Sequence, residues 1–373
     1  MTKLASTIRK DFSFICSRCF GEFKPSMARL VCENCKGPLV VKYLNIFQNE
    51  NMESPFDSCE GFVSLGEGNT PIVKMDRLAE RLNISEIFGK LECLNPTGSF
   101  KDRGTAMMIS LAKASKVSSL VEDSSGNAGS SVAAYCSKAG ITAHIFVPKS
   151  APQPKLDQIS VYGAITHKID GTREMVTEEA SQFVDRNRLV YGAHKLSPYF
   201  LEGTKTFAYE LVRQNQGTLP QHLIMPVGNG SLYVGAWLGF KEMIQKGMIE
   251  RAPLMHAVQA ENVRPIVNEF SGRNVAETAL PTIAGGISVS NPPRSKQIID
   301  ILKETGGQAI SVTEKAILKW QKIVAQDNGI YCEPTSAAAF AGLHQLTQNR
   351  FIVENESALV AITGFGLKDN LYI

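Results

Sequence analysis

The chain has 373 residues, of which 43% are hydrophobic and 20% are charged, so it is long enough for two or three packed domains with ordinary cores. Its net charge of +3 and dispersed Lys and Arg argue against a nucleic-acid or membrane partner, because such surfaces need clustered positive charge. No apolar run approaches the roughly 20 residues of a membrane helix, and the stretch from Met1 to Phe12 lacks the apolar core of a signal peptide. We therefore expect a soluble, cytoplasmic protein with reduced thiols.

Four of the eight cysteines fall in one register near the start of the chain. Cys16 and Cys19 are separated by two residues, as are Cys32 and Cys35, and twelve residues lie between the pairs. Such pairs form turns that present two thiolates each to one tetrahedral ion, so the pattern predicts a zinc ribbon over residues 1–44. Four thiolates leave the ion no open position, and the zinc is therefore predicted to be structural. The alternative is a set of four incidental thiols.

A polar and acidic stretch, residues 45–62, is predicted to be a linker. Beyond it, short apolar runs alternate with helical patterns, which predicts an α/β fold with largely parallel sheets. Strands are expected at 87–91, 119–121, 144–147, 165–168, 223–227, 254–259, 309–312 and 358–362. Helices are expected at 127–139, 172–186, 201–214, 232–246 and 313–327.

A turn over residues 95–98 leads into Lys101, from which a largely buried helix is predicted. A lysine at the positive end of a helix, beside Arg103 and away from bulk water, is expected to favour the neutral amine, the form that attacks an aldehyde. Lys101 is therefore the candidate anchor for a cofactor held as a Schiff base. The alternative is a surface lysine on a first helical turn.

Three further loops follow predicted strands, where ligands collect in α/β folds. The loop at 124–129 opens a helix whose N–H groups suit a carboxylate or phosphate, and Asn127 adds a side-chain amide. The loop at 226–231 contains closely placed glycines, which let the backbone wrap an anion and predict a phosphate cup. Taken singly, either loop also fits a plain strand-to-helix turn. Thr363 ends the last strand and is predicted to bond a ring nitrogen.

Together these loops resemble those of the fold-type II pyridoxal-phosphate enzymes, most closely the threonine synthases, over nearly the whole chain. The resemblance extends to the runs at 66–71, 201–206 and 333–339, and to the amino-terminal ribbon seen in some threonine synthases. It implies that Lys101 carries pyridoxal 5'-phosphate and that Asn127 bonds its phenolic oxygen. It also implies a homodimer acting on a small amino acid, with a large cofactor-binding domain (63–104 and 192–373) and a small mobile domain (105–191).

The candidate site residues follow from the loops and the resemblance. Those assigned to the cofactor are Lys101, Asn127, Gly228, Asn229, Gly230, Ser231 and Thr363. Those assigned to the substrate are Ser124, Ser125, Gly126, Ala128, Lys195 and Phe200.

The sequence departs from the threonine synthases where they bind the phosphate of O-phosphohomoserine. They use threonine, serine, arginine and asparagine where this chain has Ala128, Lys195, Phe200 and Asn229. Alanine and phenylalanine cannot bond phosphate, although Lys195 keeps one positive charge. The run at 284–289 also reads more like that of serine/threonine dehydratases.

The prediction is accordingly a pyridoxal-phosphate-dependent lyase, with threonine synthase as the first hypothesis. A neutral hydroxyl such as Thr363 opposite the ring nitrogen favours elimination and replacement over transamination. The alternatives are β-elimination or β-replacement on serine, threonine or an activated serine, and a γ-replacement paralogue of specialised metabolism. A non-enzymatic reading, a zinc-ribbon adaptor with an α/β body, predicts a colourless protein.

Overall fold

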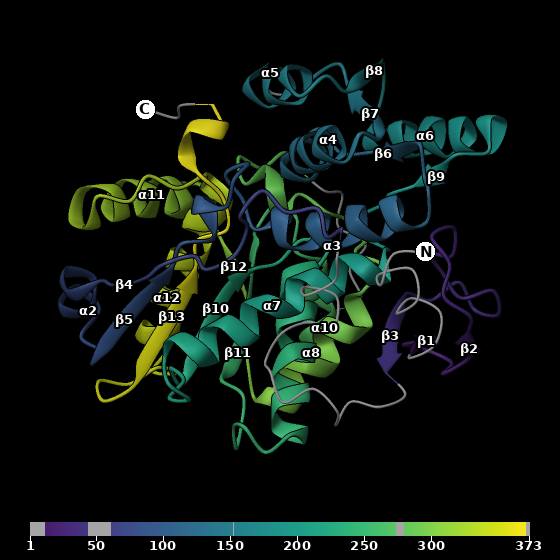
Figure 1. The fold of residues 1–373 in the computed structure, drawn as a ribbon. Coiled ribbons are helices and arrows are strands. Elements are labelled where there is room, and N and C mark those ends of the chain that lie inside the picture. The colour runs from purple at the N-terminus through teal and green to yellow at the C-terminus, as the bar shows by residue number, and fades with distance from the viewer. Residues whose placement is uncertain (1–11, 44–60, 152, 274–279, 371–373) are drawn as a thin grey trace. The chain divides into compact units, whose positions relative to one another are not determined.

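The computed structural model describes residues 12–43, 61–151, 153–273 and 280–370, which cluster into two compact units (Figure 1). Unit 1 comprises Met1–Gly68 and Lys101–Tyr209, and unit 2 comprises Asn69–Phe100 and Glu210–Ile373. Lys101 is thus the first residue after the chain passes from unit 2 into unit 1. The predicted linker lies almost wholly outside the described residues, and the predicted domain limits stay predictions.

The amino-terminal part of unit 1 is a three-stranded antiparallel sheet in the order β2-β1-β3. Its strands are β1 (Phe12–Cys16), β2 (Glu22–Phe23) and β3 (Leu39–Tyr43). Phe12 and Phe14 point to one face of β1, and both rings contact Tyr199, with ring centroids 6.3 and 5.2 Å away. The sheet therefore shares a hydrophobic core with the rest of unit 1.

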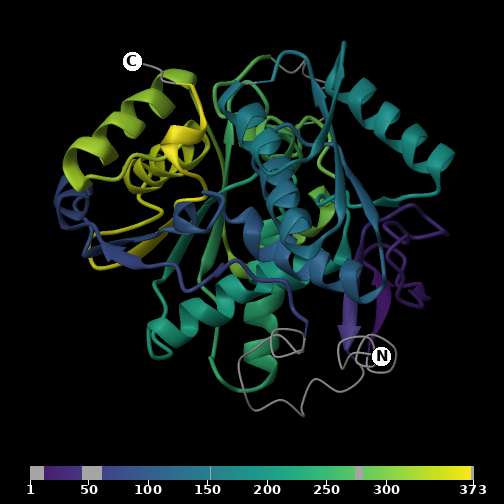
Figure 2. The same ribbon diagram turned by 45° about the horizontal axis from the view of Figure 1, so that its top comes forward.

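Unit 1 also contains a parallel sheet in the order β8-β7-β6-β9. Leu120 faces the core shared with α3 and α4, whereas its neighbour Val121 packs against Val176 and Ala180 of α6 on the other face, and Figure 2 turns these helices toward the viewer. The sheet is thus covered on both sides, as a parallel sheet requires. The strands are β6 (Ser119–Glu122), β7 (Thr142–Pro148), β8 (Ile165–Ile169) and β9 (Val190–Tyr191). The helices of the unit are α3 (Lys101–Ala114), α4 (Asn127–Ala139), α5 (Gln153–Val161) and α6 (Arg173–Asn187), and α7 (Pro198–Gln214) runs from unit 1 into unit 2.

Unit 2 is built on a six-stranded sheet in the order β12-β11-β10-β13-β5-β4, in which only the edge strand β4 runs antiparallel. Its central strands are almost entirely buried, consistent with apolar runs rather than alternation. The strands are β4 (Ile72–Lys74), β5 (Glu86–Lys90), β10 (His222–Pro226), β11 (Leu254–Ala260), β12 (Ala309–Val312) and β13 (Ser357–Ala361). The helices are α2 (Asp76–Leu82), α8 (Ser231–Gln245), α9 (Pro265–Phe270), α10 (Ser295–Thr305), α11 (Glu314–Asn328) and α12 (Pro334–Gln348).

The predicted α/β class is confirmed, and each expected strand is found within two residues of its predicted ends. Some of the elements that the sequence did not predict are short or lack a clear period, although the 11-residue, amphipathic helix α10 is neither. The strand β9 has two residues, and β4 has three, too few to show an apolar run. The helix α12 has buried residues around most of its circumference, so it has no polar face to reveal its period.

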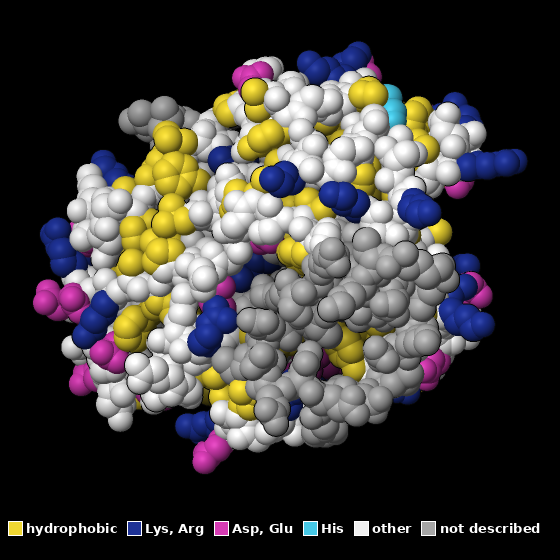
Figure 3. All heavy atoms as spheres, in the orientation of Figure 1, with side chains coloured by type: hydrophobic (Ala, Val, Ile, Leu, Met, Phe, Trp, Pro, Cys, Tyr) yellow, Lys and Arg dark blue, Asp and Glu magenta, His cyan; other side chains and the backbone are white. Residues whose placement is uncertain are grey.

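Charged side chains on the face shown in Figure 3 are not gathered by sign. In Figure 3, Lys and Arg side chains of the described residues are dispersed and mixed with Asp and Glu. Within the same residues, no helix has both the length and the apolar character needed to cross a membrane.

Candidate active site

In unit 2, the turn that leads to Lys101 is bound to the loop that carries Thr363. The N–H of Phe100 donates to the Thr363 carbonyl oxygen at 3.1 Å, and Ser99 pairs with Gly364 in an isolated antiparallel bridge. The Lys368 ammonium donates to the carbonyl oxygen of Thr97 in the same turn. The residue directly before Lys101 is therefore fixed by the end of β13.

Thr363 itself is buried, with 3% of its surface exposed, and lies next to a second hydroxyl. Its Oγ1 is 3.1 Å from Oγ of Ser336, in the first turn of α12, and the same Ser336 oxygen accepts the Gly364 N–H at 3.0 Å. The predicted bond from Thr363 to a ring nitrogen stays a prediction. Ser336 is a neighbour that the sequence analysis did not single out, although the run at 333–339 contains it.

The glycine loop of unit 2 lies between β10 and the amino terminus of α8. Gly230 has a φ of 80°, and a Cβ placed on it would lie 2.5 Å from Cδ1 of Ile298. A Cβ on Gly228 would lie 2.9 Å from the carbonyl oxygen of Gly286. Side chains are thus excluded at both positions, which leaves a backbone cradle at the positive end of a 15-residue helix. This cradle fits the phosphate of pyridoxal phosphate.

In unit 1, the first turn of α3 carries Lys101 and is held against α4. Asp102 is fully buried and accepts a hydrogen bond from Oγ of Ser131 at 2.6 Å. The ring of Phe200, also fully buried, occupies the space beside Gly104, where an added Cβ would lie 2.5 Å from the ring. The Lys101 ammonium is 5.7 Å from the centroid of that ring. The prediction of a buried helix beginning at Lys101 is confirmed, and Phe200 forms an apolar flank beside the lysine.

The loop that holds Ser124, Ser125 and Gly126 folds tightly over the first turn of α4. A Cβ on Gly129 would lie 1.9 Å from the Ser124 carbonyl oxygen, so only glycine permits this approach. The helix begins at Asn127, as predicted, with Gly126 as its N-cap residue. Backbone N–H groups at this terminus suit the carboxylate of an amino acid. The roles predicted for Asn127 and Ala128 stay predictions.

Two buried carboxylates that the sequence analysis missed lie directly before this loop. The first, Asp123, is 3.1 Å from Nη2 of Arg173 and 3.1 Å from Nζ of Lys195, and it accepts a hydrogen bond from Thr177. Burial alone would raise the pKa of Asp123, but Arg173 and Lys195 hold that pKa well below its usual range. The charge of Lys195 is therefore already paired within the protein.

The second carboxylate, Glu122, is hydrogen-bonded to His194. One oxygen lies 2.8 Å from Nδ1 of the imidazole, and the other accepts the His194 N–H at 3.2 Å. The imidazole contacts the Phe200 ring, with centroids 5.8 Å apart. Burial lowers the pKa of His194, and the nearby charge of Lys101 acts in the same direction, although Glu122 opposes both. The net shift thus favours the neutral imidazole.

The topology explains this pairing. Glu122 ends β6, and His194 follows β9, which is the parallel neighbour of β6. Both residues therefore emerge at the carboxyl edge of the same sheet. In the sequence, the acidic pair between a buried strand and a Ser-Gly-Asn loop could have indicated the two carboxylates. The position of His194 could not be predicted, because β9 has only two residues.

The four predicted metal ligands are brought together in unit 1. The sulfur atoms of Cys16, Cys19, Cys32 and Cys35 all lie within 4.8 Å of one another. The two turns have matching backbone bonds, because Phe20 N–H donates to Cys16 and Lys36 N–H to Cys32. The spacing fits one tetrahedral ion with four thiolate ligands.

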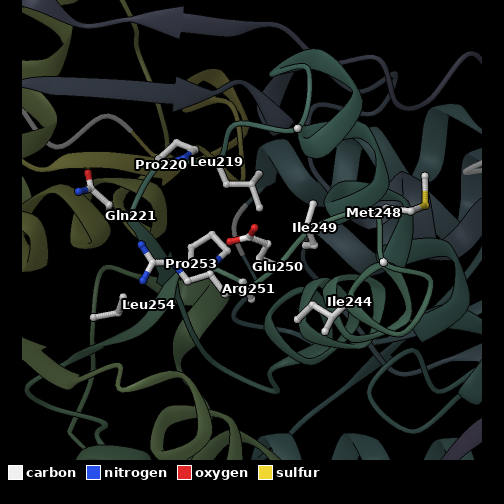
Figure 4. Close-up of a pocket in the computed structure, with 13 residues that line it drawn as sticks. Leu219, Pro220, Gln221, Ile244, Met248, Ile249, Glu250, Arg251, Pro253 and Leu254 are labelled. Atoms are coloured by element: carbon white, nitrogen blue, oxygen red, sulfur yellow. The ribbon is translucent and has the colours of Figure 1, made fainter.

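A cavity of about 750 Å³ in unit 2 lies away from these loops (Figure 4). Gln221 and Leu254 line it at the amino ends of β10 and β11, whereas the glycine loop follows the opposite end of β10. It is therefore no part of the candidate site.

Comparison with known proteins agrees with this geometry. Residues 63–364 match the family described as "Pyridoxal-phosphate dependent enzyme". The chain is 36% identical to the threonine synthase of Methanocaldococcus jannaschii over 82% of this chain and 76% of that one. It is 32% identical to the threonine synthase of Methanosarcina acetivorans over 95% and 91% of the two chains.

Solved structures show the same fold. A fungal L-serine ammonia-lyase from Rhizomucor miehei superposes with a TM-score of 0.69 at 21% identity, over 80% of this chain and 94% of that one. Maize serine racemase superposes with a TM-score of 0.68 at 21% identity, over 80% and 88%. The chain therefore belongs to the pyridoxal-phosphate-dependent enzymes, as a threonine-synthase-like lyase of fold type II.

Proposed function

We propose that this enzyme is a threonine synthase, which converts O-phosphohomoserine and water into threonine and phosphate. The observation that carries the proposal is the 32–36% identity to threonine synthases over most of the chain. When bound, pyridoxal phosphate supplies an electron sink that stabilises a carbanion at Cα of the amino acid.

The residues of this chain take the following roles in the proposal. Lys101 holds the cofactor and, once released, its amine moves the Cα proton. The glycine cradle at 228–231 binds the cofactor phosphate, and Asn127 bonds the phenolic oxygen. The Thr363 hydroxyl would donate a hydrogen bond to the unprotonated ring nitrogen, with Ser336 Oγ as its neighbour at 3.1 Å. The N–H groups at 124–128 bind the substrate carboxylate.

A second function is favoured by the surroundings of the predicted phosphate residues. Ala128 has no polar side-chain atom, Phe200 is fully buried beside Lys101, and Asp123 pairs with Lys195. A charge-assisted bond to a phosphate is worth roughly 1.5–3 kcal/mol, so the loss of the arginine weakens selection for a phosphorylated substrate. The second candidate is therefore β-elimination or β-replacement on serine, threonine or an activated serine.

A panel of substrates separates these functions. O-Phosphohomoserine, O-phosphoserine, O-acetylserine, serine and threonine are offered in parallel, and phosphate, acetate and 2-oxo acid are measured. Threonine and phosphate in equal amounts from O-phosphohomoserine are the expected result. Release of 2-oxobutyrate from free threonine as the dominant reaction would establish the second function instead.

We also propose that Cys16, Cys19, Cys32 and Cys35 bind one structural zinc ion. The support is the convergence of four sulfur atoms within 4.8 Å and the packing of the surrounding sheet on Tyr199. Elemental analysis of freshly purified protein should give one zinc per chain, and its absence would refute the site. Cys19→Ser should lower thermal stability, and it should leave kcat unchanged while the fold persists.

The remaining expectations concern assembly and movement. We propose a cytoplasmic homodimer in which residues 105–191 move when substrate binds. Light scattering should give twice the chain mass, and a monomer would refute the dimer. Identical hydrogen-exchange rates in this segment with and without a bound substrate analogue would refute the movement.

A further inference from the structure

The Glu122–His194 pair of unit 1 leaves one ring nitrogen of the histidine open. Both Glu122 oxygens are used on His194, one by Nδ1 and one by the backbone N–H. Within the part of the chain that the structure describes, no protein group is hydrogen-bonded to Nε2, and 5% of the residue's surface stays exposed. The imidazole is thus fixed at one edge and accessible at the other.

The carboxylate also fixes the tautomer. A carboxylate only accepts hydrogen bonds, so Nδ1 carries the proton and donates it to Glu122. Nε2 of the neutral ring then holds a lone pair. Burial lowers the pKa of His194, which favours the neutral ring that carries this lone pair.

The imidazole ring and the candidate anchor Lys101 share a neighbour. The centroid of the Phe200 ring is 5.8 Å from that of His194 and 5.7 Å from the Lys101 ammonium. Asp123, on the same edge of the sheet, is engaged by Arg173 and Lys195, so it does not compete for the imidazole.

We propose that His194, oriented by Glu122, is the base that takes a proton from the water molecule added to the substrate. This inference rests on the proposed threonine synthase reaction, and it assigns a residue to the hydration step.

Loss of phosphate from Cγ together with a Cβ proton leaves a Cβ–Cγ double bond, and loss of the Cα proton with protonation at Cγ moves it to Cα–Cβ. The hydration step then adds water across this Cα–Cβ double bond. One O–H bond breaks, its electron pair forms the bond from oxygen to Cβ, and the proton moves to Nε2. The π electron pair is taken up at Cα, which receives a proton from the Lys101 amine. The positive charge of the imidazolium is balanced by the Glu122 carboxylate, and the imidazolium returns its proton to solvent.

Two substitutions remove the lone pair by different routes. In His194→Asn the amide nitrogen replaces Nδ1 and keeps the bond to Glu122, but nothing replaces Nε2. In Glu122→Gln the amide oxygen still accepts the His194 N–H, while the NH₂ group donates to Nδ1 and forces the proton onto Nε2. His167→Asn, on the distant β8, is the matched control because it removes a half-buried histidine of the same unit.

The readout is the ratio of threonine to phosphate formed from O-phosphohomoserine. Both His194→Asn and Glu122→Gln should keep releasing phosphate, while the ratio falls on the order of 100-fold and 2-oxobutyrate replaces threonine. His167→Asn should keep the unaltered ratio of one. A purely structural role for His194 would slow both products equally and leave the ratio unchanged.

Nitrogen NMR of the histidines provides a test independent of turnover. The unaltered protein should show His194 with its proton on Nδ1, and Glu122→Gln should shift the proton to Nε2. A proton on Nε2 in the unaltered protein overturns the inference. If the unaltered enzyme forms no threonine, the proposed function fails and the hydration role fails with it. If it does and His194→Asn keeps the ratio, the inference alone fails.

Discussion

The two strand-to-helix loops of the candidate site differ in the residues that shape them. In unit 2, the loop at 228–231 is shaped by the absence of side chains, because a Cβ on Gly228 or Gly230 would meet neighbouring atoms at 2.9 or 2.5 Å. In unit 1, the loop at 124–126 follows two buried carboxylates that engage a histidine, a lysine and an arginine. Cofactor binding at the first loop should thus depend on the volume of the side chain at the glycine positions. The stability of the second loop should depend on charge and pH.

The largest effect is expected from a substitution in the glycine cradle. Gly230→Ala places a Cβ at a positive φ and against Ile298, which costs roughly 1–3 kcal/mol. We expect the affinity for pyridoxal phosphate to fall about 10- to 100-fold, because the strained backbone and the contact with Ile298 shift the loop from its cradle geometry. Titration of cofactor-free protein, followed by absorbance, measures this change.

The other end of the same helix supplies the control. Gly247 also has a positive φ, of 68°, but a Cβ there would meet no atom within 4 Å. Gly247→Ala should therefore lower stability by backbone strain alone and leave the cofactor affinity unchanged. Equal loss of affinity in both variants would mean that general destabilisation, not the cradle, controls binding.

The charged loop predicts a smaller effect that depends on pH. The pKa of Asp123 is depressed by Arg173 and Lys195, so its contribution to stability is present above the unfolded pKa near 3.9 and is lost as the pH falls below it. At pH 7, Asp123→Asn should lower the free energy of unfolding by roughly 1–3 kcal/mol. Urea unfolding at pH 7 and at about pH 3 should show the difference shrinking.

A solvent-exposed ion pair provides the control for this measurement. Asp170 pairs with Lys149 at 3.0 Å, but 84% of its side chain is exposed. Asp170→Asn should change the free energy of unfolding by less than about 1 kcal/mol at either pH. A difference between Asp123→Asn and the unaltered protein that stays constant with pH would contradict the ion-pair account.

The same contrast explains what the sequence could predict. The helix starts at Lys101 and Asn127 and the glycine loop were predictable because each depends on local chain chemistry: a turn before a helix, or glycines after an apolar strand. The Glu122–His194 pair was not, because it depends on β9 pairing with β6, and a two-residue strand carries no periodic signal. Ser336 was hidden for a similar reason, since its hydroxyl meets Thr363 only in the folded sheet.

The central claim is that the chain binds pyridoxal phosphate through Lys101. Borohydride reduction of the purified enzyme, followed by peptide mass mapping, tests it most directly. We expect one phosphopyridoxyl group per chain, on the peptide that contains Lys101, and none in Lys101→Ala. A colourless protein without a reducible group, or a group attached to another lysine, would contradict the account.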